Sequence, residues 1–187
     1  MIVLTAKATE KKQLILDTTK IFILEYGLND LTLERIAANA NISKGGLLYH
    51  FPNKLALMEG LTEKVFSDFI QEVHLEVEQD TEPYGKWSRA LIIVSEKDLK
   101  QNAELNVGIL SSSILDETNV SSVLQQFQQL FAKLDDDHLP ATTATIIRLT
   151  LDGLYYNQIF NIAPVEKKQM DKVIENLLSQ TYPGVES

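Results

Sequence analysis

The residues of this chain best suited to chemistry lie close together, between Lys44 and His50. Lys44 supplies a cation, Tyr49 a phenolic hydroxyl and His50 an imidazole, and Gly45 and Gly46 follow the lysine directly. In the first turn of a short helix each glycine costs about 1 kcal/mol of helix propensity relative to alanine. A helix start without side chains can, however, lie against a phosphate or a base edge with its N–H groups facing it. The group is therefore suited to contact nucleic acid, and an ordinary polar surface helix is the alternative.

A predicted helix and a turn precede this group. Thr32 is a good N-cap, because its hydroxyl can accept from the free N–H groups of the next turn, so we expect a helix to begin at Leu33. Asn41 ends this helix, since asparagine tolerates the left-handed conformation that is common just after a helix. Helical spacing gives the segment a narrow apolar stripe, made of Leu33, Ile36, Ala37 and Ala40.

A second N-cap begins the helix that carries the glycines. Ser43 caps it, and we expect it to run from Lys44 to about His50. Pro52 has no N–H group and pushes the residue before it out of helical geometry, which ends the segment. Residues 31–51 therefore predict a helix-turn-helix, with its second helix suited to a DNA major groove.

At these positions the chain resembles the tetracycline-repressor (TetR) family of bacterial regulators. The similarity in specific motif covers about Leu14 to Leu61, the first third of the chain. Proteins of that family are all-α homodimers, with an N-terminal three-helix DNA-binding head and a larger C-terminal domain that binds a small effector. The residues that carry the resemblance are Thr32, Ile36, Ala37, Ala40, Ile42, Ser43, Lys44, Gly45, Leu47, His50, Phe51, Lys54 and Leu57.

The resemblance implies a fold, a function and partners. The fold is all-α with about nine helices, divided into a helix-turn-helix DNA-binding domain (1–52) and a helical effector-binding and dimerisation domain (53–187). The function is that of a ligand-responsive transcriptional regulator, a repressor that releases its operator when a small apolar effector binds. The partners are double-stranded DNA with an inverted-repeat operator, the effector and a second copy of the chain. The residues expected to contact DNA are Thr32, Ser43, Lys44, Gly45, Gly46, Tyr49, His50 and Lys54.

Three positions depart from the usual family pattern. The family often carries a phosphate-contacting tyrosine where Leu48 stands, and here the aromatic residue comes one position later, at Tyr49. Asn41 replaces the usual glycine of the turn. Glu34 stands where many members place a polar or basic DNA contact. Its carboxylate can accept from a cytosine amino group, but we favour a solvated partner of the helix dipole.

Charge is distributed unevenly along the chain. The net charge is −9, yet residues 1–60 hold seven basic and six acidic residues, while the remainder holds ten basic and twenty acidic ones. An acidic body repelled by phosphate leaves only the head able to approach DNA. Lys7, Lys11 and Lys12 are either a phosphate-binding arm or a solvated helix start.

Composition excludes other classes of protein. The absence of cysteine excludes a disulfide scaffold and thiolate chemistry, and it is compatible with a reducing compartment. No apolar run approaches the roughly 20 residues that span a bilayer, and residues 2–4 are too short and lack the basic flank of a signal peptide. We expect a cytoplasmic protein that does not contact membranes.

The rest of the chain reads as helices. The first is expected from about Thr9 to Tyr26, with Gly27 ending it. Asn53 caps a longer helix that reaches about Glu78, before a polar break from Gln79 to Gly85. Further helices are expected at Lys86–Leu99, Ala103–Leu115, Ser121–Leu134, Ala141–Phe160 and Val165–Thr181.

The last two helices carry apolar stripes that suit assembly. On periodicity alone, packing inside one chain explains these stripes equally well. A dimer is favoured because one short recognition helix reads too few base pairs. The expected interface residues are Leu151, Leu154, Val173, Ile174, Leu177 and Leu178.

An effector pocket is expected among the large side chains of the second domain, although plain core packing is the alternative for each aromatic residue. Arg148 or Asn157 would orient a polar group of the effector. The expected lining residues are Trp87, Leu91, Phe127, Phe131 and Tyr155.

We expect no enzymatic activity, no cofactor and no metal. The chain has three histidines, and the run Asp135–Asp137 followed by His138 is predicted to be a solvated acidic turn, because a metal site needs convergent ligands. The remaining alternative is a helical ligand-binding or scaffold protein without DNA function, but it leaves Gly45 and Gly46 unexplained.

Overall fold

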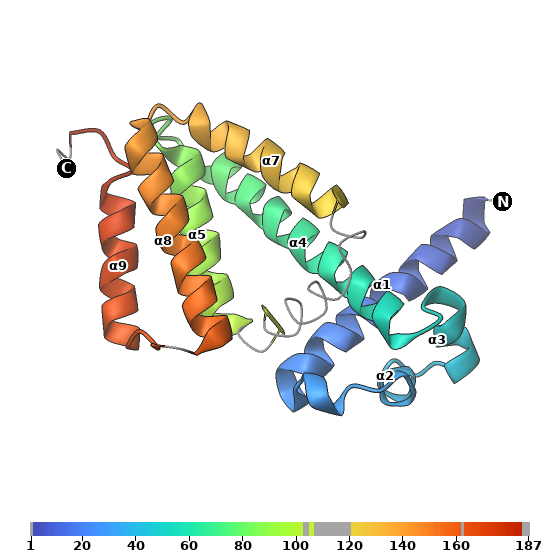
Figure 1. Cartoon of the computed structure of the whole chain (residues 1–187). Coiled ribbons are helices and arrows are strands. Elements are labelled where there is room, and N and C mark those ends of the chain that lie inside the picture. The colour runs from blue at the N-terminus through green and yellow to red at the C-terminus, as the bar shows by residue number, and fades with distance from the viewer. Residues whose placement is uncertain (1, 103–104, 107–120, 162, 185–187) are drawn as a thin grey trace. The chain divides into compact units, whose positions relative to one another are not determined.

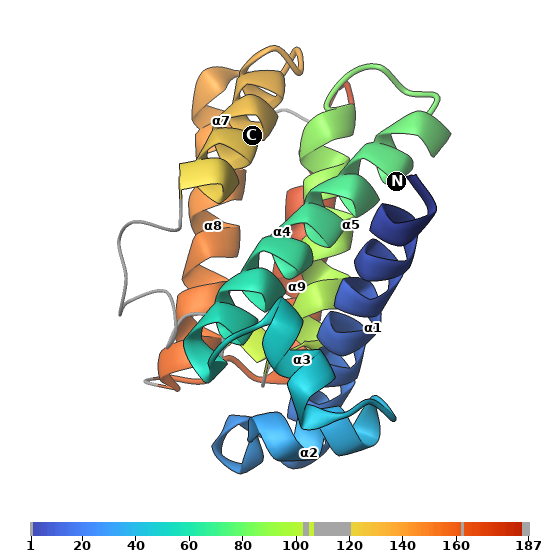
Figure 2. The same ribbon diagram turned by 90° about the vertical axis from the view of Figure 1, so that its right-hand side faces the viewer.

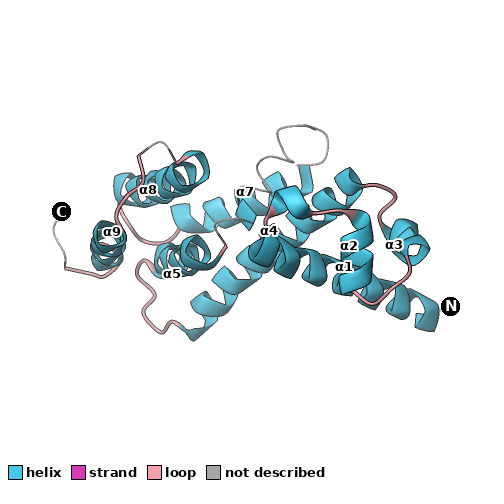
Figure 3. Ribbon diagram, turned by 90° about the horizontal axis from the view of Figure 1, so that it is seen from below, coloured by secondary structure: helices cyan, strands magenta, loops and turns pink. Residues whose placement is uncertain are grey.

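The computed structural model describes residues 2–102, 105–106, 121–161 and 163–184. Throughout these ranges the regular secondary structure is helical, without a strand, which confirms the predicted all-α class (Figure 3). No helix within them is long and apolar enough to cross a membrane. The chain divides into two compact units, residues 1–66 with 104–121 and residues 67–103 with 122–187.

Within residues 2–66 the first unit contains four helices and a short 3-10 turn. They are α1 (Ile2–Tyr26), η1 (Leu28–Asp30), α2 (Leu33–Asn39), α3 (Lys44–His50) and the first part of α4 (Lys54–Gln79) (Figures 1 and 2). Helix α1 begins well before the predicted Thr9, because no glycine or proline interrupts residues 2–8. Gly27 ends it as predicted, with a left-handed φ of 78°.

The core of this unit draws on every one of its helices. Helix α4 approaches the end of α3 closely, since a Cβ on Gly60 would lie 2.7 Å from Cε1 of Phe51. The unit therefore extends beyond residue 52, where the sequence places the domain boundary. Its buried side chains are Ile15, Leu16, Phe22, Ile23, Leu31, Ile36, Ala37, Leu47, Phe51, Leu57, Met58, Leu61, Val65 and Leu105.

The second unit contains the rest of α4 and four further helices. They are α5 (Lys86–Gln101), α7 (Ser121–Asp135), α8 (Ala141–Phe160) and α9 (Lys167–Ser179). The bounds of α8 are those predicted, and those of the other three lie within about two residues of prediction. The helix predicted at Ala103–Leu115 falls largely outside the described residues. Helices α5, α8 and α9 lie side by side (Figure 1).

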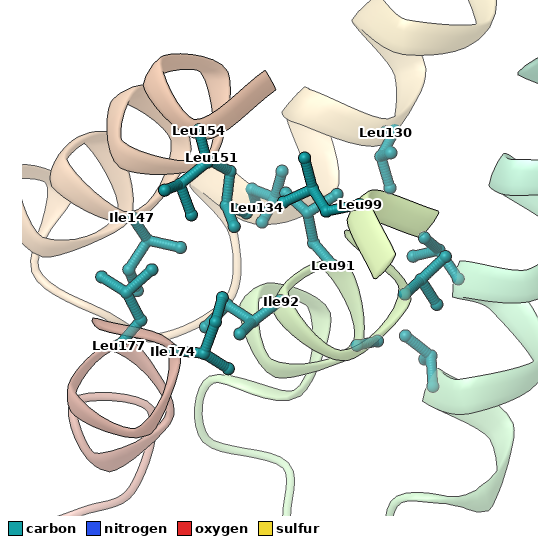
Figure 4. Packing of buried hydrophobic residues seen from close by; sticks show 14 of the residues in the cluster. Leu91, Ile92, Leu99, Leu130, Leu134, Ile147, Leu151, Leu154, Ile174 and Leu177 are labelled. Carbon is teal, nitrogen blue, oxygen red and sulfur yellow. The ribbon is translucent and has the colours of Figure 1, made fainter. Parts of the chain in front are cut away.

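A single apolar cluster joins the helices of the second unit. Figure 4 shows side chains of α5, α7, α8 and α9 pointing toward one another. Their burial removes large apolar area from water, which is the main stabilising contribution to such a unit. The labelled members are Leu91, Ile92, Leu99, Leu130, Leu134, Ile147, Leu151, Leu154, Ile174 and Leu177.

The start of α5 is capped by an aspartate from the turn after α7. Asp137 is only 2% exposed. Its two carboxylate oxygens accept from the backbone N–H groups of Trp87 at 2.9 Å and Ser88 at 2.7 Å. The prediction of a solvated acidic turn is therefore wrong for Asp137, although Asp135 and Asp136 are exposed. A cap supplied from about 50 residues away leaves no local pattern to recognise.

A buried arginine joins the same end of α5 to the segments around it. Arg89 is 3% exposed, and its Nε donates to Oδ2 of Asp80 at 2.6 Å. The guanidinium also lies 4.4 Å from the ring centroid of Tyr182. Its remaining side-chain hydrogen bonds reach the carbonyl oxygens of Glu82, Tyr84 and Thr181 and the hydroxyl of Thr181. The buried guanidinium thus holds the segments at this end of the unit together through several charge-assisted hydrogen bonds.

Candidate nucleic-acid interface

Both predicted caps of the helix-turn-helix are confirmed. The hydroxyl of Thr32 accepts from the N–H of Arg35 at 3.2 Å, and the hydroxyl of Ser43 accepts from the N–H of Gly46 at 3.0 Å. Asn41 takes the predicted left-handed conformation, with φ of 53°. The turn between α2 and α3 is thus set by local hydrogen bonds, which fixes where α3 begins.

The two glycines of α3 have different surroundings. A Cβ on Gly45 would meet nothing within 4 Å, so this position opens to solvent. A Cβ on Gly46 would lie 3.2 Å from Oγ of Ser43, the oxygen that caps the helix. Gly45 therefore leaves room for an approaching molecule, whereas Gly46 leaves room for the cap.

Helix α3 has one buried side and one exposed side. Leu47 is fully buried in the core of the first unit, while Tyr49 is 81% exposed. The ring of Tyr49 meets that of His50 edge-on, with 5.1 Å between centroids. Lys44 and Gly45 are also exposed. We call Lys44, Gly45 and Tyr49 the α3 surface.

An ion pair connects α2 to the α3 surface. Nζ of Lys44 lies 2.5 Å from Oε1 of Glu34, and both side chains are more than half exposed. The hydrogen bond from Lys44 is the main cause that holds the pKa of Glu34 below its ordinary value. Glu34 is thus a specific partner of Lys44, which the sequence did not reveal because the two residues belong to different helices.

Two further basic side chains near the helix-turn-helix, those of Lys54 and Arg35, have partners within the first unit. Nζ of Lys54 donates to the carbonyl oxygen of Leu31 at 2.9 Å, which connects the start of α4 to the segment before α2. Arg35, the one arginine of residues 1–66, pairs with Asp30 at 3.1 Å. Its guanidinium also lies 4.8 Å from the ring centroid of Phe22.

The five residues predicted to line an effector pocket all lie in or against the core of the second unit. The rings of Phe127 and Phe131 are neighbours, 5.8 Å apart, and Trp87 meets His74 edge-on at 5.1 Å. The hydroxyl of Tyr155 donates to Oδ2 of Asp98 at 3.0 Å.

The polar groups near these residues have partners within the second unit. Burial is the first cause that raises the pKa of Tyr155, and the neighbouring charge of Asp98 adds to it. Arg148 lies 5.5 Å from the ring centroid of Phe131. Asn157, by contrast, bonds to Ala163 and Val165 after the end of α8. Asn157 thus shapes the connection to α9.

Four of the predicted interface residues lie inside the second unit. Leu151, Leu154, Ile174 and Leu177 are buried in its core (Figure 4), and Val173 and Leu178 are partly buried against it. Periodicity identified an apolar face correctly, but it does not tell whether that face packs within the chain or against a second copy.

A different face of α8 is apolar and exposed. Ile146, Leu149, Tyr156 and Phe160 recur along one side of the helix, and each is close to half exposed or more. The rings of Tyr156 and Phe160 stack with 6.2 Å between centroids. Gly153 lies between Leu149 and Tyr156 in sequence, and a Cβ there would meet nothing within 4 Å. We call these four apolar residues the α8 face.

Comparison with known proteins supports the same fold over nearly the whole chain. The chain is 25% identical to the probable acrEF/envCD operon repressor of Escherichia coli K12, covering 95% of this chain and 90% of that one. The fatty acid degradation regulator FadR of Bacillus halodurans shares the fold, with a TM-score of 0.63, 16% identity and coverage of 93% and 99%. A TetR-family transcriptional regulator of Haemophilus influenzae matches with a TM-score of 0.58, 20% identity and coverage of 92% and 96%.

Two family models together match most of the chain. Residues 15–61 match the model described as bacterial regulatory proteins, tetR family. Residues 85–182 match the model described as tetracyclin repressor-like, C-terminal domain. The first range contains the helix-turn-helix, and the second contains α5 to α9. The chain therefore belongs to the TetR family of bacterial transcriptional regulators.

Proposed function

We propose that this transcriptional regulator is a repressor that binds an inverted-repeat operator as a homodimer and leaves it when a small, mainly apolar effector binds. The observation that carries the proposal is the two-sided character of α3, where Leu47 is fully buried and Tyr49 is 81% exposed. A helix anchored on one side and bearing an exposed aromatic residue and a cation on the other suits contact with base edges and phosphates. The homologous operon repressor of Escherichia coli supports repression.

The α3 surface reads the operator. Lys44 and Tyr49 offer side chains to base edges, His50 lies beside Tyr49, and Gly45 leaves an open approach for the DNA. Gly46 contributes by keeping the helix cap intact. Substitution of Lys44 or Tyr49 is therefore expected to change base preference.

Three further side chains position the head on the phosphates. The hydroxyls of Thr32 and Ser43 accept backbone hydrogen bonds as caps and keep their own protons, which they can donate to phosphate oxygens. Lys54 uses one ammonium hydrogen on the carbonyl oxygen of Leu31 and has two left to donate. These contacts carry no sequence information.

Dimerisation occurs through the α8 face. Exposed apolar side chains that recur along one side of a helix are suited to burial against an identical face related by a two-fold axis. Two copies of a short recognition helix then read two half-sites, about one or more helical turns of 34–36 Å apart. Val173 and Leu178 on α9, which are partly buried against the core, remain further candidates for the interface.

The effector acts from the second unit. Trp87, Leu91, Phe127, Phe131 and Tyr155 provide apolar surroundings for it, and the hydroxyl of Tyr155 offers a polar anchor if the effector displaces its bond to Asp98. Helix α4 contributes to the cores of both units, so a ligand that prefers one position of α4 alters DNA affinity. The protein acts in the cytoplasm, where the DNA of a bacterium lies.

A selection from random-sequence duplexes tests this proposal. Purified protein should enrich an inverted repeat, and Lys44→Ala or Tyr49→Phe should shift the bases preferred within each half-site. Recovery of no common sequence, or of a single unrepeated site, would contradict it. If a variant keeps its full DNA affinity and its base preference, the substituted residue, Lys44 or Tyr49, does not read the bases.

A further inference from the structure

The ion pair between Glu34 and Lys44 spans the exposed side of the helix-turn-helix. Glu34 is the second residue of α2 and Lys44 is the first of α3. Nζ and Oε1 lie 2.5 Å apart, and 56% of the lysine and 60% of the glutamate side chain are exposed. The pair is therefore in solvent, where a molecule bound to the α3 surface can reach both groups.

Such a pair contributes little to folding. Two long exposed side chains must be held in place, and water and salt screen their attraction. The hydrogen bond from Lys44 nevertheless lowers the pKa of Glu34, which further favours the charged form of its carboxylate. The ion pair therefore affects mainly the binding of a molecule, such as DNA, that approaches Lys44.

On most DNA the carboxylate weakens binding. A lysine gains affinity by neutralising a phosphate and releasing a counterion. Lys44 paired with Glu34 brings no net charge to the DNA, and the first sixty residues carry only one net positive charge. Glu34 thus lowers the affinity for any sequence that offers nothing to a carboxylate.

One kind of base pair offers partners to both groups. In the major groove a G·C pair presents the O6 and N7 acceptors of guanine next to the amino donor of cytosine. An ammonium group can donate to the guanine and a carboxylate can accept from the cytosine, and the ion pair already holds these groups side by side. We infer that Glu34 is a specificity-determining residue, which reads a G·C base pair in each half-site together with Lys44 and suppresses binding elsewhere. This inference rests on the proposed contact between the α3 surface and DNA.

The test compares Glu34→Gln with the wild type and with Glu25→Gln. Glu25 is exposed on α1 of the same unit, so its variant loses the same charge while the ion pair of Lys44 with Glu34 is kept. Each protein is used in a selection from random duplexes and in salt titrations on the selected operator and on a scrambled duplex. Glu34→Gln should bind the scrambled duplex more tightly, with a salt slope steeper by about two for a dimer. It should also lose about fivefold or more of the G·C preference at one position of each half-site.

Each other outcome has a defined meaning. If Glu34→Gln keeps the G·C preference, or if Glu25→Gln loses it equally, the inference is overturned. Wild-type protein that selects no sequence would refute the proposed DNA contact itself, which is a separate result.

Discussion

Replacing Asp137 by alanine should destabilise the second unit more than any exposed substitution in the same turn. The carboxylate accepts from the N–H groups of Trp87 and Ser88 at 2.9 and 2.7 Å, and Ser88 is fully buried. Alanine would leave two donors without a partner, at a cost of about 1–3 kcal/mol for each buried donor. We expect a loss of about 3 kcal/mol, which also covers the usual cost of removing an N-cap, about 1 kcal/mol.

Thermal and urea unfolding followed by circular dichroism measure this loss. For a chain of this length about 3 kcal/mol corresponds to a fall in Tm of about 6–12 °C. Asp136→Ala is the matched control, because Asp136 is exposed in the same turn and the charge change is identical. Asp137→Asn keeps one acceptor oxygen and should lose about half as much. Equal stability of Asp137→Ala and Asp136→Ala would refute the capping role.

Three further predictions follow from the second unit. Leu149→Asp, on the α8 face, should leave the fold intact and give monomers of about 21.1 kDa by light scattering. Leu177→Asp should instead destabilise the chain by about 3 kcal/mol or more, since it buries an unpaired charge. Burial raises the pKa of Asp80, but the hydrogen bonds from Arg89 and from the backbone of Glu82, together with the nearby positive charges, outweigh it and hold this pKa below its ordinary 3.8. The stability difference between wild type and Asp80→Asn should therefore persist above pH 4 and shrink as pH falls further. An effector titrated against the fluorescence of Trp87, the single tryptophan, should release operator DNA in parallel; a ligand that changes this fluorescence but not the operator affinity is not coupled to the head.

The helix-turn-helix could be predicted because its determinants are local. Thr32 and Ser43 cap helices within three residues of themselves, and Gly27 and Asn41 take the left-handed conformations expected of their residue types. The bounds of α8 were predictable for a related reason, since Pro140 stands directly before its first residue and Asn161, which takes a left-handed conformation, directly follows its last. The alternative of a scaffold without DNA function loses its support once residues 15–61 match the DNA-binding model of the family.

Features that depend on distant partners could not be predicted. Asp137 lies in an acidic run that looks solvated, and only the position of α5, about 50 residues away, makes it a buried cap. Glu34 and Lys44 lie on separate helices, so no spacing rule within one helix pairs them. The stripes of α8 present the hardest case, because Leu151 and Leu149 are equally apolar, yet the first is buried in the core and the second is exposed.

Hydroxyl-radical footprinting on the selected operator tests the central claim most directly, that this regulator reads DNA as a symmetric dimer through the α3 surface. Wild-type protein should protect two patches related by a two-fold axis, about one or more helical turns of 34–36 Å apart. Tyr49→Ala, which removes the most exposed aromatic ring of the first unit's described residues, should weaken both patches equally without changing the unfolding curve. Protection of a single asymmetric patch, or a footprint unchanged by Tyr49→Ala, would contradict the account.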